Sequence, residues 1–543
     1  VQKYINEVAF SGAEEFMNTY KDSAKDAGII GHFGLGFYSA FMVAEKVEII
    51  TKSYKDEPAA HWTCDGSPEF TLTSNDKKER GTEIILHIAK DSTEFLEESR
   101  IRELLTKYNK FMPVPIIFGT KTETLPKPEG ADEKDPAPTI EVPNVINNPH
   151  PAWTKQPAEL KEEDYKAFYR ELYPMQFEEP LFHIHLNVDY PFNLTGILFF
   201  PKLKGDLNLQ KDKIQLYQNQ VYVTDHVEGI VPEFLTMLRG VIDSPDIPLN
   251  VSRSYLQADG AVKKISSYIT KKVADKLSSL FKNDRADFES KWNDIKIVIE
   301  YGMLSEEKFM EKADGFALYP TIDGQFYTWT ELEEKIKPNQ TDKDGTFVLL
   351  YASDQDAQHS YIQAAKEKGY EVLLLDSPIV AHLMQKLETT KEKVHFARID
   401  TDPIDKLIKK TDDTISKLSD EQKDTLKSKI EAVVASKEYA VQMEAMDSSA
   451  APFMITEPEF MRRMKEMQQT GGGGMFGLGN MPDMYQLVVN TNHPLITEIL
   501  EAKTDKKQEK LIAQSVDLAK LSKGLLKGAA LTDFIQRSYS LIK

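Results

Sequence analysis

Short apolar and alternating runs in the first 120 residues predict a sheet with few helices. The expected strands are 46–54, 59–66, 69–74 and 81–88. Before them, the apolar stretch 37–44 predicts a short helix, and a second helix is predicted after Ser11, with Glu14 in capping-box register. We therefore expect an antiparallel sheet that is covered on one face.

A mixed pattern of strands and helices extends from 151 to 404. The predicted strands are 181–190, 196–201, 213–225, 345–353 and 370–376. A long amphipathic helix is predicted at 261–281, and a shorter helix at 356–369 lies between the last two strands. This order of elements is typical of an α/β domain in two parts.

Composition divides the rest of the chain. Residues 121–150 are rich in proline and charge and poor in apolar side chains, which predicts a linker, with a long surface loop as the alternative. Residues 405–543 begin with a charged helical pattern at 417–436 and end in helices. One face of the last helix carries the apolar residues Leu531, Phe534, Ile535, Leu541 and Ile542. We thus predict domains at 1–120, 151–404 and 405–543, with 121–150 between the first two.

Charge and cysteine content narrow the class of protein. The 543 residues carry 67 Lys and Arg against 86 Asp and Glu, a net charge of −19, which argues against a general nucleic-acid binder. The one cysteine, Cys64, can form no intrachain disulfide and fits a reducing compartment. No apolar run reaches the length of a membrane span. We expect a cytoplasmic protein with no membrane and no nucleic-acid partner.

A glycine cluster, GIIGHFGLG at 28–36, is the first candidate site. Glycines allow backbone N–H groups to gather around an anion. The cluster is not a Walker loop, because no Gly-Lys-Ser/Thr follows it, and no strand directly precedes it as in a dinucleotide fingerprint. Spacing alone leaves a phosphate-binding loop and a mobile glycine-rich loop equally open, and a lid that closes over a nucleotide would be both.

Several longer stretches resemble the Hsp90 chaperone family, in particular its bacterial members. The family's nucleotide lid and the strands after it are matched by AFSGAEEF, IGHFGLGFYSAFMVAEKVEI and RGTEIILHI. The start of its middle domain is matched by HPAWTKQPAEL, its catalytic loop by IPLNVSRSYLQ at 247–257, and its dimerisation domain by NHPLITEIL and the terminal helices. The resemblance implies an α+β and α/β multidomain chain. Its parts would be a partial GHKL-type nucleotide-binding α/β sandwich, an α/β middle domain and a mostly helical C-terminal dimerisation domain.

The resemblance also implies roles for individual residues toward ATP and Mg²⁺. The implied nucleotide-binding residues are Gly31, Phe33, Gly34, Gly36, Phe37 and Thr82. In the catalytic loop, Arg253 matches the arginine that reaches the γ-phosphate, Gln257 a glutamine on the same loop, and Asn250 an asparagine that shapes it. A permanently charged, planar guanidinium can stabilise the charge that develops in phosphoryl transfer. Without the resemblance, a surface arginine beside a capping Ser252 would be the commoner interpretation.

The sequence departs from the family pattern in three places. An acidic residue often follows the motif arginine, and here Ser254 does. Paired arginines of many members are replaced by the neutral Gln218, Asn219 and Gln220, so a phosphate contact there is in doubt. The catalytic glutamate, the Mg²⁺-binding asparagine and the adenine-binding aspartate of the family would lie upstream of Val1. We expect them to belong to the polypeptide, and an intact mass above 61.7 kDa would test this.

A methionine-rich stretch is the candidate surface for client proteins. Nine of the 17 methionines fall between Met443 and Met484. The implied client-contact residues are Phe460, Met461, Met464, Met467, Met475 and Phe476. Flexible thioether side chains suit a surface that must fit many partners, and the adjacent glycines Gly471–Gly474 argue against a rigid core position. The alternative is a stripe packed in the core or in a dimer interface.

Together these observations predict an ATP-dependent chaperone that works as a homodimeric clamp on client proteins. The first alternative is an ATP-independent holdase that uses the methionine-rich stretch alone. The second is a DNA-acting enzyme with the same nucleotide fold, against which the negative charge and the LNVSR motif count. His183 and His185 alternate on one strand face, and we interpret them as a satisfied pair because no third metal ligand suggests itself.

Overall fold

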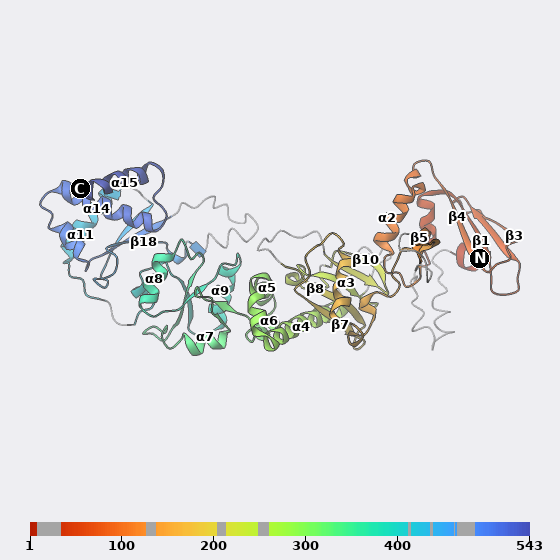
Figure 1. The fold of residues 1–543 in the computed structure, drawn as a ribbon, viewed down its shortest axis with the longest axis horizontal. Coiled ribbons are helices and arrows are strands. Elements are labelled where there is room, and N and C mark those ends of the chain that lie inside the picture. Colours follow the sequence, from red (N-terminus) through yellow and green to blue (C-terminus); the bar gives the residue numbers. More distant parts are fainter. Residues whose placement is uncertain are drawn as a thin grey trace. The chain divides into compact units, whose positions relative to one another are not determined.

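The computed structural model gives two compact units. It describes residues 1–7, 34–125, 137–202, 213–227, 229–247, 260–410, 414–434, 438–460, 462–463 and 484–542. The first unit comprises the described residues up to Lys272, and the second those from Val273 onward (Figure 1). Both units mix helices and sheets, which confirms the predicted multidomain α+β class. No helix within these ranges combines the length and apolar character needed to cross a membrane.

The first sheet of the chain is antiparallel, with strand order β3-β2-β1-β4. Its strands are β1 (Ala44–Lys52), β2 (Ala59–Cys64), β3 (Thr71–Asn75) and β4 (Gly81–Ile88). All four were predicted from their alternating patterns. The turns η1 (Gln2–Asn6) and η2 (Gly36–Met42) supply apolar side chains that pack on one face of β1 and β2. The helix predicted at 37–44 is present as the 3₁₀ helix η2, which spans Gly36–Met42.

A helix and a β-ribbon follow this sheet. The elements are η3 (Thr93–Leu96), α2 (Glu98–Tyr108), β5 (Ile117–Thr124) and β6 (Thr139–Val145). β5 and β6 pair antiparallel, so regular structure enters the segment 121–150 that was predicted to be a linker. The charged and proline-rich composition of the segment hid the pairing, because both strands are mostly exposed and the alternation in β6 covers only Ile140 and Val142 before Pro143. The predicted domain limits stay predictions.

A five-stranded sheet with order β10-β9-β11-β8-β7 forms the core of the first unit. Its strands are β7 (Phe182–Val188), β8 (Leu194–Phe200), β9 (Ile214–Gln218), β10 (Val221–Thr224) and β11 (Arg239–Asp243). The helical segments of this unit are η4 (Ala152–Thr154), η5 (Pro157–Glu159), α3 (Glu162–Leu172), η6 (Glu233–Leu235) and the part of α4 (Gly260–Asn283) up to Lys272. Only the β9–β11 pair is parallel. Aromatic side chains from α3 and η4, with Phe111, pack on one face of this sheet.

The second unit begins with helices and a parallel three-stranded sheet of order β15-β14-β16. The elements are α5 (Arg285–Ser305), α6 (Glu307–Ala313), β12 (Tyr319–Pro320), β13 (Phe326–Tyr327), α7 (Trp329–Lys335), β14 (Phe347–Ala352), α8 (His359–Glu367), β15 (Val372–Leu374), α9 (Val380–Thr390), β16 (Val394–Arg398) and α10 (Ile404–Leu407). The central strand β14 is buried at every position, as expected for a parallel strand with both faces covered.

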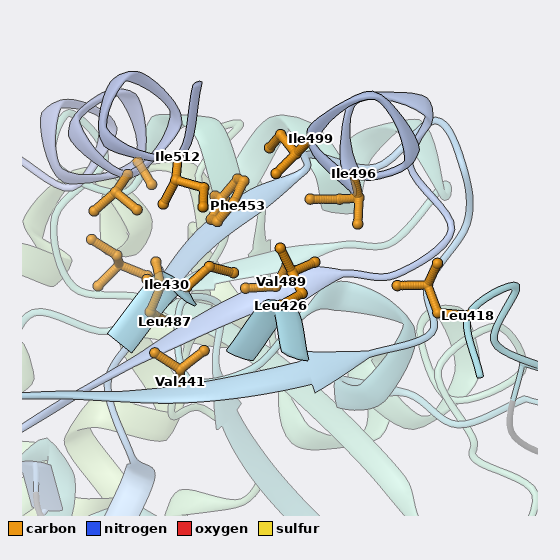
Figure 2. Close-up of a cluster of buried hydrophobic side chains, with 13 residues drawn as sticks. Leu418, Leu426, Ile430, Val441, Phe453, Leu487, Val489, Ile496, Ile499 and Ile512 are labelled. Carbon is orange, nitrogen blue, oxygen red and sulfur yellow. The ribbon is translucent and has the colours of Figure 1, made fainter. Parts of the chain in front are cut away.

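The last part of the chain is mostly helical, as predicted, and it contains one small sheet in addition. Its elements are α11 (Asp420–Val434), β17 (Tyr439–Glu444), β18 (Phe453–Thr456), β19 (Tyr485–Asn490), α13 (Pro494–Leu500), α14 (Asp505–Ser522) and α15 (Gly528–Ile542). Besides the expected helices it holds the mixed sheet β17-β19-β18, which sequence reasoning missed. Figure 2 shows side chains of α11, α13, α14 and all three strands meeting in one apolar cluster.

Candidate functional site

The described end of the glycine-rich loop is fastened to the first sheet by an aromatic side chain. Gly34 has a φ of 64°, a left-handed conformation that favours glycine, and Gly36 begins η2. The next residue, Phe37, meets the buried Trp62 edge to face, with ring centroids 5.7 Å apart. Gly31 and Phe33 lie outside the described residues.

Thr82 lies on the same face of this sheet as Phe37. It sits directly opposite Thr51 on β1, and the two hydroxyl oxygens are 2.8 Å apart. In an antiparallel pair opposite residues share a face, so Thr82 lies on the side that carries Ile49, against which η2 packs. The neighbouring Ile84 on that face is 54% exposed. The structure thus brings Phe37 and Thr82 to one sheet face, and Thr82 presents an exposed hydroxyl there.

The predicted catalytic residues Asn250, Arg253 and Gln257 lie outside the described residues, but the chain that leads to them is described. It leaves β11 at Asp243, and each of the next residues is held by a hydrogen bond. Ser244 donates its hydroxyl to the carbonyl of Asn193 (2.6 Å), and Asp246 accepts from the backbone N–H of Asn193 (2.5 Å). Gln218 donates its amide to the carbonyls of Pro245 (3.2 Å) and Ile247 (3.4 Å). The chain is therefore anchored as far as Ile247, the last described residue before the segment that carries the predicted catalytic residues.

The tight turn between β9 and β10 is the centre of this anchor. Gln220 donates its backbone N–H to Asp243 Oδ2 (2.9 Å), and its side-chain amide to the carbonyls of Phe111 (2.8 Å) and Pro149 (2.9 Å). The indole N–H of Trp153 also donates to Asp243 Oδ2, at 3.2 Å. Burial raises the pKa of the Asp243 carboxyl, which these hydrogen bonds only partly oppose. Sequence reasoning noted the neutral residues at 218–220 and found no role for them.

The turn itself adopts an unusual backbone. Asn219 and Gln220 have φ values of 50° and 63°, as the two central residues of a type I′ turn require. Asparagine tolerates this region, but glutamine does so at a cost of about 1 kcal/mol or more. The three hydrogen bonds that Gln220 makes offset that cost. The conformation therefore persists because the contacts around the turn hold it.

Of the predicted client-contact residues, the structure describes Phe460. Its side chain is 69% exposed, which excludes a core position for it. The remaining ones lie outside the described residues; they are Met461, Met464, Met467, Met475 and Phe476. Two arginines just after Phe460 form ion pairs with acidic side chains. Arg462 donates to Glu459 at 2.7 Å, and Arg463 donates to Glu388 at 2.7 and 3.1 Å. These ion pairs thus hold the chain beside Phe460 in place, while the Phe460 side chain is exposed to solvent.

Asp400 is the centre of a buried ion cluster that reaches Glu457, three residues before Phe460. It is 1% exposed and accepts hydrogen bonds from Arg398 (2.6 and 3.1 Å), from Gln358 (2.9 Å) and from Lys523 at the end of α14. Arg398 also pairs with Glu457 at 2.6 Å. Burial disfavours the charge of Asp400, but the adjacent Arg398 and Lys523 cations outweigh it and hold the pKa of Asp400 below its usual range. The cluster joins β16, the segment before Phe460 and α14.

The histidine pair of β7 contacts Tyr165, but the interpretation as a satisfied pair holds only in part, because the buried His185 Nε2 has no hydrogen-bond partner among the described residues. Tyr165 stacks on His183 with ring centroids 3.6 Å apart, and its hydroxyl lies 2.9 Å from His185 Nδ1. Burial lowers the pKa of His185. Across the described part of the chain, no group of three or more His, Cys, Asp and Glu side chains is placed to hold a metal ion.

Comparison with known proteins supplies the context for these features. Residues 129–542 match the sequence profile of the family described as Hsp90 protein. The chain is 50% identical to the chaperone protein HtpG of Bacteroides thetaiotaomicron, over all of this chain and 88% of that protein. It is 50% identical to HtpG of Porphyromonas gingivalis, over all of this chain and 87% of that protein. The HtpG of Alcanivorax borkumensis is 30% identical, over 96% of this chain and 82% of that protein.

Proposed function

Because the chain belongs to the Hsp90 family of chaperones, we propose that it is an ATP-driven molecular chaperone whose homodimer acts as a clamp on unfolded or partly folded client proteins. The observation that carries the proposal is the 50% identity, over all of this chain, to bacterial proteins named as chaperones. The relatives are bacterial, and we place the protein in a bacterial cytoplasm. The net charge of −19 supports the proposal that the protein has no nucleic-acid partner.

The nucleotide would be held by the end of the glycine-rich loop and by β4. We assign this role to Gly31, Phe33, Gly34, Gly36, Phe37 and Thr82. The exposed Thr82 hydroxyl fits it, because a hydroxyl can make up to three hydrogen bonds and Thr51 takes one. Phe37 packs on the same sheet face as Thr82, so a movement of the loop would change the surroundings of the bound nucleotide. We assign no Mg²⁺ ligand among these 543 residues.

Hydrolysis of ATP to ADP and phosphate would depend on the loop 248–259. Arg253 would stabilise the negative charge that builds on the transferring phosphoryl group. Gln257 would act from the same loop, and Asn250 would shape that loop. Because this loop and Thr82 come from different parts of the chain, turnover would require the two parts to approach each other. That requirement would couple hydrolysis to the movement of the clamp.

Client binding would use the exposed segment that begins at Phe460. Met461, Met464, Met467, Met475 and Phe476 would supply adaptable apolar contacts. The dimer would form through the last two helices, α14 and α15, whose exposed apolar side chains support this role. They are Leu518, Leu521, Ile535 and Tyr539, which are 42–67% exposed. The predicted contributions of Leu541 and Ile542 concern side chains that the structure does not describe.

The test of the ATPase proposal is turnover by the purified protein and by its Arg253→Ala variant. We expect the variant to bind nucleotide nearly as well as the parent does. Its turnover should fall by about 100-fold or more, because an arginine that acts on the γ-phosphate in the transition state raises kcat by at least that factor. Unchanged turnover would remove Arg253 from the mechanism.

Client aggregation separates the proposal from its alternative. We expect the protein to suppress aggregation of a heat-denatured enzyme, and ATP to change that suppression in the parent more than in Arg253→Ala. Suppression that is the same with and without ATP would support an ATP-independent holdase instead. Binding of DNA that weakens with added salt would support the DNA-acting alternative.

A further inference from the structure

The β9–β10 turn gathers groups from four separate places in the chain. Asp243 Oδ2 accepts from the indole of Trp153 and from the backbone of Gln220, and the Gln220 amide reaches the carbonyls of Phe111 and Pro149. Phe111 follows α2, whereas Pro149 follows the β5–β6 ribbon. The turn is thus bonded both to the chain that arrives from the first sheet and to the end of β11.

The same end of β11 leads directly into the loop that carries Arg253. Ile247 is six residues before Arg253, and its carbonyl accepts from Gln218, the last residue of β9. The backbone N–H of Ser244 donates to the carbonyl of Tyr217, at 3.2 Å. A displacement of the turn would therefore displace residues 244–247, since three of their backbone groups are bonded to β9.

We infer that Asp243 is a positioning residue for phosphoryl transfer: by holding the β9–β10 turn against Trp153, it sets the base of the loop from which Arg253 reaches the nucleotide. This inference rests on the proposed role of Arg253. Asp243 acts through other groups and touches no reacting atom. Its place inside the protein, 6% exposed, makes it a rigid support.

The inference predicts a specific kinetic change. Displacing a catalytic group by about 1 Å can cost about 100-fold in rate without weakening ground-state binding. Asp243→Asn keeps the side-chain volume but replaces the carboxyl group with a neutral amide, whose oxygen accepts the N–H groups of Gln220 and Trp153 more weakly than a carboxylate does. We expect kcat for ATP hydrolysis to fall about 10- to 100-fold, with KM for ATP within about twofold of the parent.

The matched control is Tyr165→Phe. It also removes a buried hydrogen bond, the contact with His185, but it lies over β7, at the opposite edge of the same sheet from β10. We expect kcat to be unchanged in this variant. Gln218→Leu is a second test, because it removes the donor to Pro245 and Ile247 without changing the buried carboxyl. It keeps the inference testable if Asp243→Asn does not fold, and we expect the same pattern with a smaller loss.

A double variant decides whether Asp243 acts through Arg253. If it does, Asp243→Asn combined with Arg253→Ala will be no slower than Arg253→Ala alone. A further loss in the double variant would overturn the inference, as would a normal kcat in both Asp243→Asn and Gln218→Leu while Arg253→Ala is impaired. Normal turnover in Arg253→Ala would instead refute the proposed role of that arginine, so the two failures are distinguishable.

Discussion

A buried carboxyl on α5 should make the stability of the second unit depend on pH. Glu300 faces a cavity of about 20 Å³, which is large enough for one water molecule. Its Oε2 atom has no hydrogen-bond partner among the described residues, nor has the hydroxyl of Tyr319 on the same cavity wall. Burial raises the pKa of Glu300 to about 7; a hydrogen bond from Ser377 and the charge of Lys296 oppose this, and Asp376 adds to it.

The sign of the effect follows from the two pKa values of Glu300. The unfolded chain releases this proton near pH 4.5 and the folded chain near 7. Between these values the folded state holds more protons, so the free energy of unfolding falls as pH rises from 4.5 to 7 and is level above 7. A difference of about 2.5 pKa units corresponds to roughly 3 kcal/mol.

The perturbation is Glu300→Gln, which keeps the volume and a partner for Ser377 but cannot ionise. Relative to the parent, we expect it to stabilise the second unit by up to roughly 3 kcal/mol at pH 8, and by less than about 1 kcal/mol at pH 5. Urea unfolding followed by the fluorescence of Trp292 and Trp329, the tryptophans of this unit, measures the difference. Glu311→Gln, at an exposed position of α6, is the control and should show no such pH dependence.

The result that would refute this reasoning is an equal effect of Glu300→Gln at pH 5 and pH 8. That outcome would mean that Glu300 has the same charge in both conditions, and that the cavity solvates the carboxylate well enough to keep it ionised. A loss of stability at pH 8 alone would show that the carboxylate, and not the acid, is the form that the fold prefers.

Two further substitutions test the packing and the ion cluster. Asp400→Asn leaves Arg398 and Lys523 buried with one acid fewer, and we expect a loss of roughly 3–5 kcal/mol in the unfolding of the second unit. The double variant with Lys523→Met should lose less than the sum of the two single changes, and additive losses would show that the pair is not coupled. Gly240→Ala places a Cβ 2.0 Å from the carbonyl oxygen of Ile197, so we expect it to disrupt the β8–β11 pairing and to reduce the soluble yield of folded protein sharply. Gly81→Ala has a similar φ, 138° against 127° at Gly240, but open space around it; a much smaller loss there would confirm that the clash and not the backbone angle dominates at Gly240.

Strands β1–β4, β7 and β8, and β14 of the three-stranded sheet, were predicted because their side chains alternate or are apolar throughout. By contrast, β11 was missed, and the single strand expected at 213–225 is β9 and β10 joined by a tight turn. β14 is buried at all six positions, and its sequence FVLLYA is apolar throughout. The sheet β17-β19-β18 was missed because β18 has four residues and β17 has one fully buried position, Val441, so neither has a pattern that extends far enough to recognise.

The contacts that support the candidate site were beyond sequence reasoning for a different reason. Asp400 and Lys523 are 123 residues apart, and charged residues are expected at the surface unless a partner is known. The β9–β10 turn has Asn and Gln at its centre, and glutamine gives no signal for a positive φ. By contrast, Arg253 and Thr82 were identified because the motifs around them resemble those of the Hsp90 family, and their roles stay predictions.

The ion cluster at Asp400 has a consequence for how the second unit responds to heat. Removing charges from water is costly, but the hydration of ions becomes less favourable as temperature rises, so this cost falls on heating. Apolar contacts gain no comparable advantage at high temperature. The junction that holds the start of the segment at Phe460 to β16 and α14 should therefore lose less strength during heat shock than an apolar junction of the same size. A protein that binds heat-damaged partners would then keep the start of the segment at Phe460 in place at the temperatures where those partners unfold.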